Sequence, residues 1–138
     1  MKRSHNIYKS FYFAIMGLLV ALKEERNLKI QLGIFFLLLT IGFILRFEPF
    51  EWTIVLLSSS IVIVSEMINS VIERIMDYIN PEFDDRIKTI KDMSASFVLI
   101  ACLFSIIIFL ILILNRFAPY IFGLNSCFNN HFKDFKLT

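Results

Sequence analysis

The sequence predicts an all-α integral membrane protein with three transmembrane helices. Of its 138 residues, 57% are hydrophobic and 16 are phenylalanine, and the mean hydropathy is +0.72. A soluble chain of this length could not bury so much apolar surface, because small folded chains leave a large part of their surface exposed to water. Three apolar stretches, near residues 30–47, 50–70 and 97–116, are candidates for crossing a bilayer.

The segment before the first apolar stretch has the pattern of an amphipathic helix. Its apolar residues recur at spacings of three and four, which places them on one helical face: Ile7, Phe11, Ile15, Leu18 and Leu22. Basic residues that can meet lipid headgroups accompany them: Lys2, Arg3, Lys9 and Lys23. The pattern predicts a helix lying in the membrane interface. A helix packed on the spans fits the same pattern equally well.

The three spans differ in how clearly they are bounded. The first, LGIFFLLLTIGFIL (32–45), stops at Arg46. The second begins near Phe50 and carries Glu66 inside its end. The third, FVLIACLFSIIIFLILIL (97–114), has 18 uncharged residues. We therefore expect one membrane domain over residues 1–116, followed by a tail over 117–138 to which the sequence assigns no role.

Basic residues predict the orientation of the chain. They gather before the first span and again between the second and third, at Arg74, Arg86, Lys88 and Lys91. Because basic loops stay in the cytoplasm, the N-terminus and the 73–92 loop are predicted inside and the C-terminus outside. The net charge of +2 comes without a concentrated basic patch, which argues against a nucleic-acid partner.

A stripe of polar residues follows the second apolar run. On a helix over 65–79, Glu66, Asn69, Glu73 and Asp77 fall within about 80° of one another, and Asn80-Pro81 ends the helix. A charged residue near the bilayer centre costs at least about 2.5–3.5 kcal/mol, so a function is the better explanation. The alternative is that the helix has already left the membrane and exposes this face to water.

These groups suit phosphoryl transfer from a magnesium nucleotide. Mg²⁺ is held by one or two carboxylates while substrate phosphates supply further ligands. Lys91, shortly before the third span, is placed to meet phosphate oxygens. Glu66, the deepest acid, is expected to be partly desolvated and suited to accept a proton. Glu25 either reaches the metal from upstream or is a charge on a solvated helix. The chain has no glycine-rich phosphate loop, which excludes a soluble type of nucleotide fold.

The segment SEMINSVIERIMDYINPEF…IKDMSASFVLI resembles the prokaryotic diacylglycerol kinase family of small membrane lipid kinases. The family signature reads E-x-x-N-[ST]-A-I-E-x-x-x-D, with K-D beginning eighteen residues after the last Glu, and the spacing matches throughout. The matching positions are Glu66, Asn69, Ser70, Val71, Ile72, Glu73, Asp77, Lys91 and Asp92. The stretches EERNLKI and FEW (50–52) further resemble the branch that includes undecaprenol kinases. The likeness covers roughly residues 5–116.

The resemblance implies roles for particular residues. Glu66 would be the general base toward the lipid hydroxyl, and Glu25 and Glu73 would bind Mg²⁺ with ATP. The implied nucleotide-binding set is Asn69, Lys91, Asp92, Glu82, Glu25 and Glu73, with Asp77 and Ser70 in support. The resemblance also implies a homotrimer in the bacterial cytoplasmic membrane, with active sites shared between subunits.

Several positions depart from the family pattern. Val71 replaces the usual Ala, and Gln31 stands where the undecaprenol-type branch commonly has His. Ser94, Ser96 and Phe97 occupy positions where Ala or Gly is usual, and small residues there let helices approach closely. No proposed catalytic group is lost, so the departures bear on substrate choice more than on activity.

The leading hypothesis is ATP-dependent phosphorylation of a membrane lipid alcohol, either diacylglycerol or undecaprenol. A second hypothesis is a small proton pathway in which Glu66 and Asp77 relay protons, since acids inside membranes mark such paths. A third is a kinase-like protein that keeps the fold without turnover. ATP-dependent lipid labelling separates the first hypothesis from the other two.

Overall fold

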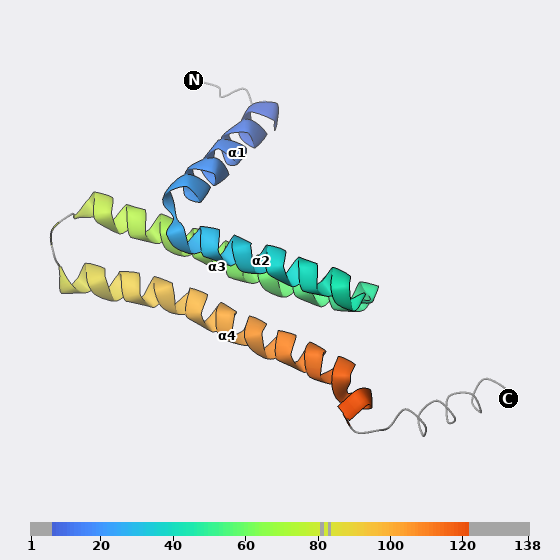
Figure 1. The fold of residues 1–138 in the computed structure, drawn as a ribbon. Coiled ribbons are helices and arrows are strands. Elements are labelled where there is room, and N and C mark those ends of the chain that lie inside the picture. Colours follow the sequence, from blue (N-terminus) through green and yellow to red (C-terminus); the bar gives the residue numbers. More distant parts are fainter. Residues whose placement is uncertain (1–6, 81, 83, 122–138) are drawn as a thin grey trace.

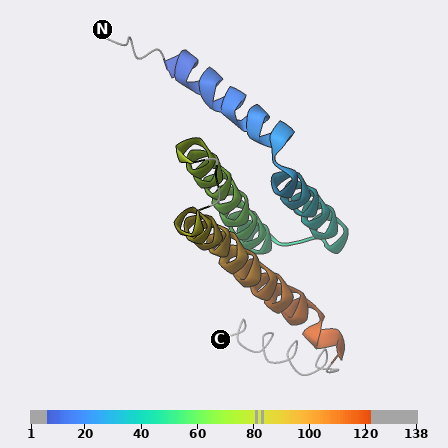
Figure 2. The same ribbon diagram turned by 90° about the vertical axis from the view of Figure 1, so that its left-hand side faces the viewer.

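The computed structural model describes residues 7–80, 82 and 84–121, and the regular structure of this part of the chain is entirely helical. The helices are α1 (Ile7–Glu24), α2 (Arg26–Leu45), α3 (Pro49–Ile79) and α4 (Asp85–Ile121) (Figure 1). The last three lie side by side, whereas α1 projects away from them (Figure 2). These three are long and apolar enough to cross a membrane, which agrees with the three spans predicted from the sequence.

The turn between α2 and α3 is fixed by local backbone chemistry. Arg46 adopts the left-handed conformation, with φ of 54°, and thereby ends α2. Pro49 occupies the start of α3, where its missing N–H leaves no hydrogen bond unmade. The carboxylate of Glu51 accepts a hydrogen bond of 2.7 Å from the backbone N–H of Glu48, as in a capping box. The chain therefore reverses direction within a few residues.

Helices α3 and α4 are longer than the apolar stretches that they contain. Helix α3 continues to Ile79 and ends where Asn80 is extended before Pro81, as the Asn-Pro pair predicts. Helix α4 begins at Asp85, well before the apolar run. The 31 residues of α3 make a helix about 46 Å long, against about 30 Å for the hydrocarbon layer. The joined ends of α3 and α4 thus extend beyond the apolar layer.

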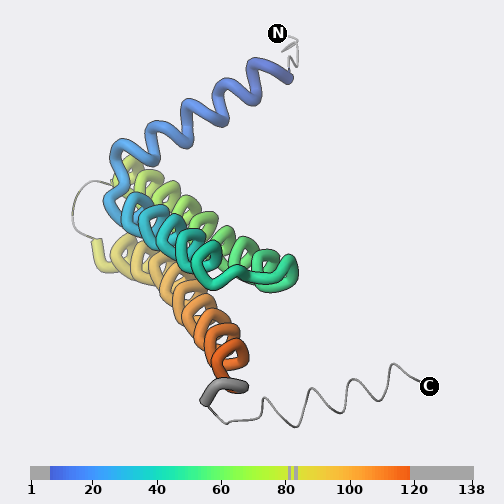
Figure 3. Tube along the Cα trace, turned by 45° about the vertical axis from the view of Figure 1, so that its right-hand side comes forward, coloured from blue at the N-terminus to red at the C-terminus, as the bar shows by residue number. Residues whose placement is uncertain are grey.

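Helix α3 packs against both α2 and α4, and α1 contacts α2 (Figure 3). A small core cluster of Phe47, Val55 and Leu112 lies near the α2–α3 turn. The Trp52 ring packs beside this cluster and directly over Gly42. A side chain at position 42 would leave too little room, since its Cβ would lie only 2.7 Å from the ring. This contact packs the start of α3 against the end of α2.

Polar contacts of Arg116 connect α4 to the α2–α3 turn at the same end of the bundle. Arg116 of α4 donates to the Glu51 carboxylate at 2.7 Å and to the carbonyl oxygens of Leu45 and Arg46. Its guanidinium also lies 5.6 Å from the centre of the Phe47 ring. The structure makes Arg116 the tie between α4 and the α2–α3 turn.

Most apolar side chains of the four helices face outward in the single chain. Phe36, Phe43 and Phe104 are each more than 60% exposed. Helix α1 lies where the periodicity predicts a helix, and most of its apolar residues are exposed. Its place in the membrane interface and the homotrimer remain predictions. Helix α4 runs past the expected boundary at 116/117, and the rest of the 117–138 tail lies outside the described residues.

Candidate active site

The predicted polar stripe lies on α3 and runs from a buried end to an exposed one. Glu66, Asn69 and Ser70 are 3%, 6% and 4% exposed, whereas Glu73 is partly buried and Asp77 is exposed. The alternative in which this face is simply wetted by water is therefore wrong at Glu66 and Asn69. The helical repeat places these side chains along one face of α3. The packing of α2 and α4 against that face buries Glu66, Asn69 and Ser70.

Two side-chain contacts join the stripe to α4. Ser94, 2% exposed, donates its hydroxyl to the Asn69 amide oxygen at 2.6 Å. The Asn69 amide nitrogen in turn donates to Glu73 at 3.0 Å. Nearer the loop, Lys91 forms an ion pair of 2.7 Å with Asp77. Lys91 thus contacts the polar stripe through Asp77, in agreement with the sequence spacing.

A polar cavity of about 480 Å³ opens between the ends of α3 and α4. Its lining contains five of the predicted site residues together with a second lysine: Glu73, Asp77, Glu82, Lys91, Asp92 and Lys88. Cationic and anionic groups therefore face the same space, which suits a ligand that carries phosphates and a metal ion. Glu66 and Ser70 do not line this cavity and lie further along α3, toward the middle of the bundle.

The buried carboxylate of Glu66 has a partner on α2. The side-chain amide nitrogen of Gln31 donates to Glu66 Oε2 at 2.7 Å. The hydroxyl of Ser70 donates to the backbone carbonyl of Glu66 and leaves the carboxylate itself free of that contact. The deepest acid of the stripe is thus held by a neutral group.

Glu25 and Glu73, the two predicted metal ligands, have different partners in the structure. The Glu25 carboxylate pairs with Arg74 of α3 at 2.7 Å, and Arg74 also pairs with Glu24 at 2.9 Å. No hydrogen bond or ion pair joins Glu25 to Glu73 within the described residues. The pairing nevertheless brings the start of α2 to the end of α3 that carries the polar cavity.

The residues present are compatible with Mg²⁺ bound together with a nucleotide. No group of three or more acidic, histidine or cysteine side chains able to hold a metal alone occurs in the part of the chain that the structure describes. Mg²⁺ usually takes only one or two protein carboxylates and completes its shell with phosphates and water. Glu73 lines the cavity, and a carboxylate that accepts one hydrogen bond keeps further lone pairs for a cation.

Sequence reasoning missed three side-chain contacts of these residues. Ser94 and Gln31 entered only as departures from the family pattern, and Arg74 entered only as a basic residue that predicts orientation. Their partners are 25, 35 and 49 positions away in the sequence. One signal was available, because polar residues inside apolar helices tend to find polar partners.

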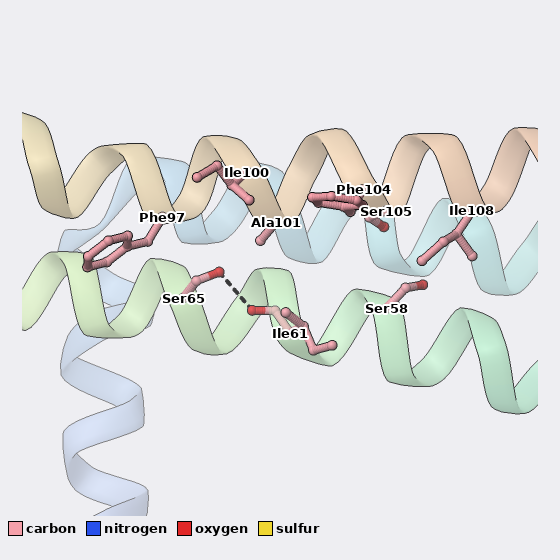
Figure 4. A pocket seen from close by; sticks show the side chains of 9 residues that line it. All are labelled: Ser58, Ile61, Ser65, Phe97, Ile100, Ala101, Phe104, Ser105 and Ile108. Atoms are coloured by element: carbon pink, nitrogen blue, oxygen red, sulfur yellow. Dashed lines mark hydrogen bonds between the residues drawn. The ribbon is translucent and has the colours of Figure 1, made fainter.

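An apolar groove of about 430 Å³ also lies between α3 and α4 (Figure 4). Phe97 stands at one end and Ile108 at the other, with Phe104 between them (Figure 4). The hydroxyl of Ser65 in this groove is satisfied by the Ile61 carbonyl at 2.7 Å. The groove is therefore a surface for hydrocarbon rather than for a polar ligand, and Phe97 narrows one end of it.

Comparison with known proteins identifies the family. The sequence model described as "Prokaryotic diacylglycerol kinase" matches residues 12–113. A protein of Helicobacter pylori named diacylglycerol kinase is 29% identical over 98 residues, which cover 71% of this chain and 77% of that protein. A Synechocystis protein of the same name is 26% identical over 104 residues, which cover 75% of this chain and 59% of that protein. Because the family match spans most of the sequence and includes the whole polar stripe, the chain belongs to the prokaryotic diacylglycerol kinase family.

Proposed function

We propose that this chain is an ATP-dependent lipid kinase that phosphorylates the hydroxyl of a membrane lipid alcohol, either diacylglycerol or undecaprenol. The observation that carries the proposal is the polar cavity between α3 and α4, from which one stripe of side chains leads to the buried Glu66. Membership in the family, with two relatives named diacylglycerol kinase, supports the class of reaction.

The cavity supplies groups for the nucleotide. Lys91 and Lys88 face it and can meet phosphate oxygens, so that a bound phosphate shares or replaces the present partner of Lys91. Asp92 and Glu82 line the same space and are expected to contact the nucleotide. Asn69 orients the Glu73 carboxylate through its amide nitrogen.

Glu73 is the first candidate to hold Mg²⁺, and the family resemblance adds Glu25. When bound, Mg²⁺ neutralises the charge that the phosphates carry during transfer. Arg74 keeps Glu25 in an ion pair, so Glu25 serves as a ligand only by sharing or exchanging this partner. Glu73 needs no such exchange, because its present partner is a neutral amide.

Glu66 is the proposed general base. As the alcohol oxygen forms its bond to the γ-phosphorus, the bond from that phosphorus to the β–γ bridging oxygen breaks and ADP leaves. The Glu66 carboxylate takes the hydroxyl proton in the same step. Its burial inside the helices suits a hydroxyl presented from the lipid layer, and the apolar groove between α3 and α4 suits the hydrocarbon chain.

We also propose that the protein is a homotrimer in the bacterial cytoplasmic membrane, with active sites shared between subunits. The N-terminus and the polar cavity would face the cytoplasm, and the C-terminus the outside, as the basic residues indicate. Membership in the family, whose resemblance implies a homotrimer with shared sites, is the support for this assembly.

Phosphate transfer from radiolabelled ATP with Mg²⁺ in mixed micelles tests the proposal. Diacylglycerol and undecaprenol are offered side by side, and we expect label in one of them. Glu66→Gln should abolish the label. Glu48→Gln, an exposed acid at the opposite end of α3, should retain it. Folded protein that labels neither lipid would refute the proposal, and proton flux in liposomes would then favour a proton pathway.

A further inference from the structure

Gln31 makes the side-chain contact that holds the buried Glu66 carboxylate. Its Nε2 donates to Glu66 Oε2 at 2.7 Å, from α2 to the neighbouring α3 (Figure 1). Within the described residues this is the one side-chain hydrogen bond to that carboxylate. Glu66 is 3% exposed, so water has little access to substitute for the amide.

Folding leaves the Gln31 amide only half satisfied. Its carbonyl oxygen Oε1 is buried without a hydrogen-bond partner. An unpaired buried acceptor costs about 1–3 kcal/mol, so a contribution to stability does not explain why glutamine occupies this position. Gln31 also lines a pocket of about 120 Å³ between α2, α3 and α4. The amide therefore has space on one side and the candidate base on the other.

We propose that Gln31 is the positioning residue for Glu66, an inference that rests on the proposed role of Glu66 as base. A neutral N–H donor fixes the direction of the carboxylate without cancelling its charge. A cation in the same place would stabilise the charged form and weaken the carboxylate as a proton acceptor.

The same amide can also serve the protonated acid. Once Glu66 has taken the hydroxyl proton, its O–H needs an acceptor. The amide carries both a donor and an acceptor, and a half-turn about the Cγ–Cδ bond of Gln31 exchanges the positions of Nε2 and Oε1. Oε1 then accepts the hydrogen bond from the acid. The unpartnered oxygen and the pocket beside it are accounted for together.

Steady-state kinetics with the preferred lipid test this role. Gln31→Met keeps the length of the side chain and removes both donor and acceptor. We expect kcat to fall about tenfold to a hundredfold, the usual effect of a misplaced catalytic group, with an unchanged KM for ATP. Gln31→His, assayed at alkaline pH so that the neutral imidazole again offers a donor and an acceptor, should recover most of kcat. Thr40→Val is the matched control on α2, because the Thr40 hydroxyl donates to the Phe36 carbonyl of its own helix and to no other helix among the described residues.

Two kinetic results would overturn the proposal. One is a Gln31→Met variant that keeps kcat within twofold of wild type. The other is a Thr40→Val control that loses as much kcat as Gln31→Met, which would indicate general sensitivity of α2.

A second measurement is independent of turnover. Gln31 is the single glutamine of the sequence, so ¹⁵N labelling of glutamine side chains gives one amide signal in solid-state NMR. The signal should move in Glu66→Leu, which removes the carboxylate without adding a second glutamine, and stay in Thr40→Val. A signal that is unchanged in Glu66→Leu refutes the contact, whatever the activity. If wild type phosphorylates neither lipid, the proposed function fails, and this signal still decides whether Gln31 holds Glu66.

Discussion

Replacing Ser94 with alanine removes the hydroxyl that connects α4 to the polar stripe of α3. In the structure this hydroxyl donates to Asn69 at 2.6 Å, and Asn69 donates to Glu73 at 3.0 Å. Ser94 and Asn69 are 2% and 6% exposed, so water has little access to replace the lost donor. The Asn69 amide then loses the contact that sets its orientation, and Glu73 loses orientation with it.

The size of the effect follows from the burial of the pair. Leaving one buried acceptor unpaired costs about 1–3 kcal/mol. Expressed as a rate, with 1.36 kcal/mol for each factor of ten, this is about a 5- to 150-fold loss in kcat/KM for ATP. The loss should fall on ATP rather than on the lipid, because Asn69 contacts the residue that we assign to Mg²⁺ and ATP.

The assay compares Ser94→Ala with Ser96→Ala at varied ATP and saturating lipid. Ser96 is a matched control, because its hydroxyl donates to the Met93 carbonyl of its own helix at 2.6 Å and, in the part of the chain that the structure describes, to no other helix. Thermal unfolding in the same detergent shows whether the cost appears in stability instead. If Ser94→Ala matches Ser96→Ala in both kcat/KM and stability, the cross-helix contact does not organise the site.

Two further predictions separate roles in the site and in the fold. Glu73→Gln should weaken ATP binding in the presence of Mg²⁺, whereas Glu66→Gln should abolish turnover and spare that binding; equal loss of binding would refute the division. Gly42→Ala should lower stability by about 1–3 kcal/mol in thermal unfolding, because its Cβ would lie 2.7 Å from the Trp52 ring. Gly33→Ala, with open space around the added carbon, should be neutral or slightly stabilising, and a matching loss there would argue against the clash.

Hydropathy and helical spacing were enough to predict the helices. The three apolar stretches appear as α2, α3 and α4, and the end of α3 at Asn80 follows from the proline after it. The helical repeat also placed Glu66 and Asp77 on one face of α3. These features depend on neighbours within one helix, which a sequence displays directly.

The partners of the site residues could not be predicted in the same way. A helix that is apolar on nearly every side gives no signal for its rotation against the next helix. The contacts of Gln31 with Glu66 and of Arg74 with Glu25 depend on that rotation. Arg116 illustrates the same limit, because its contact with the α2–α3 turn depends on how α4 crosses that turn.

The polar stripe shows an ordered change of partner along α3. At the exposed end Asp77 pairs with the cation Lys91, whereas Glu73 and the buried Glu66 each receive a hydrogen bond from a neutral amide. A buried ion pair would hold a carboxylate in its charged form and oppose proton transfer to it. An exposed ion pair is worth little and exchanges readily, so Lys91 can turn to a phosphate at small cost. At the exposed end, where ATP would enter, the stripe thus has a cation that can change partner. At the buried end, where the lipid hydroxyl would lose its proton, it has a carboxylate held by an amide. The position of that carboxylate depends on Gln31.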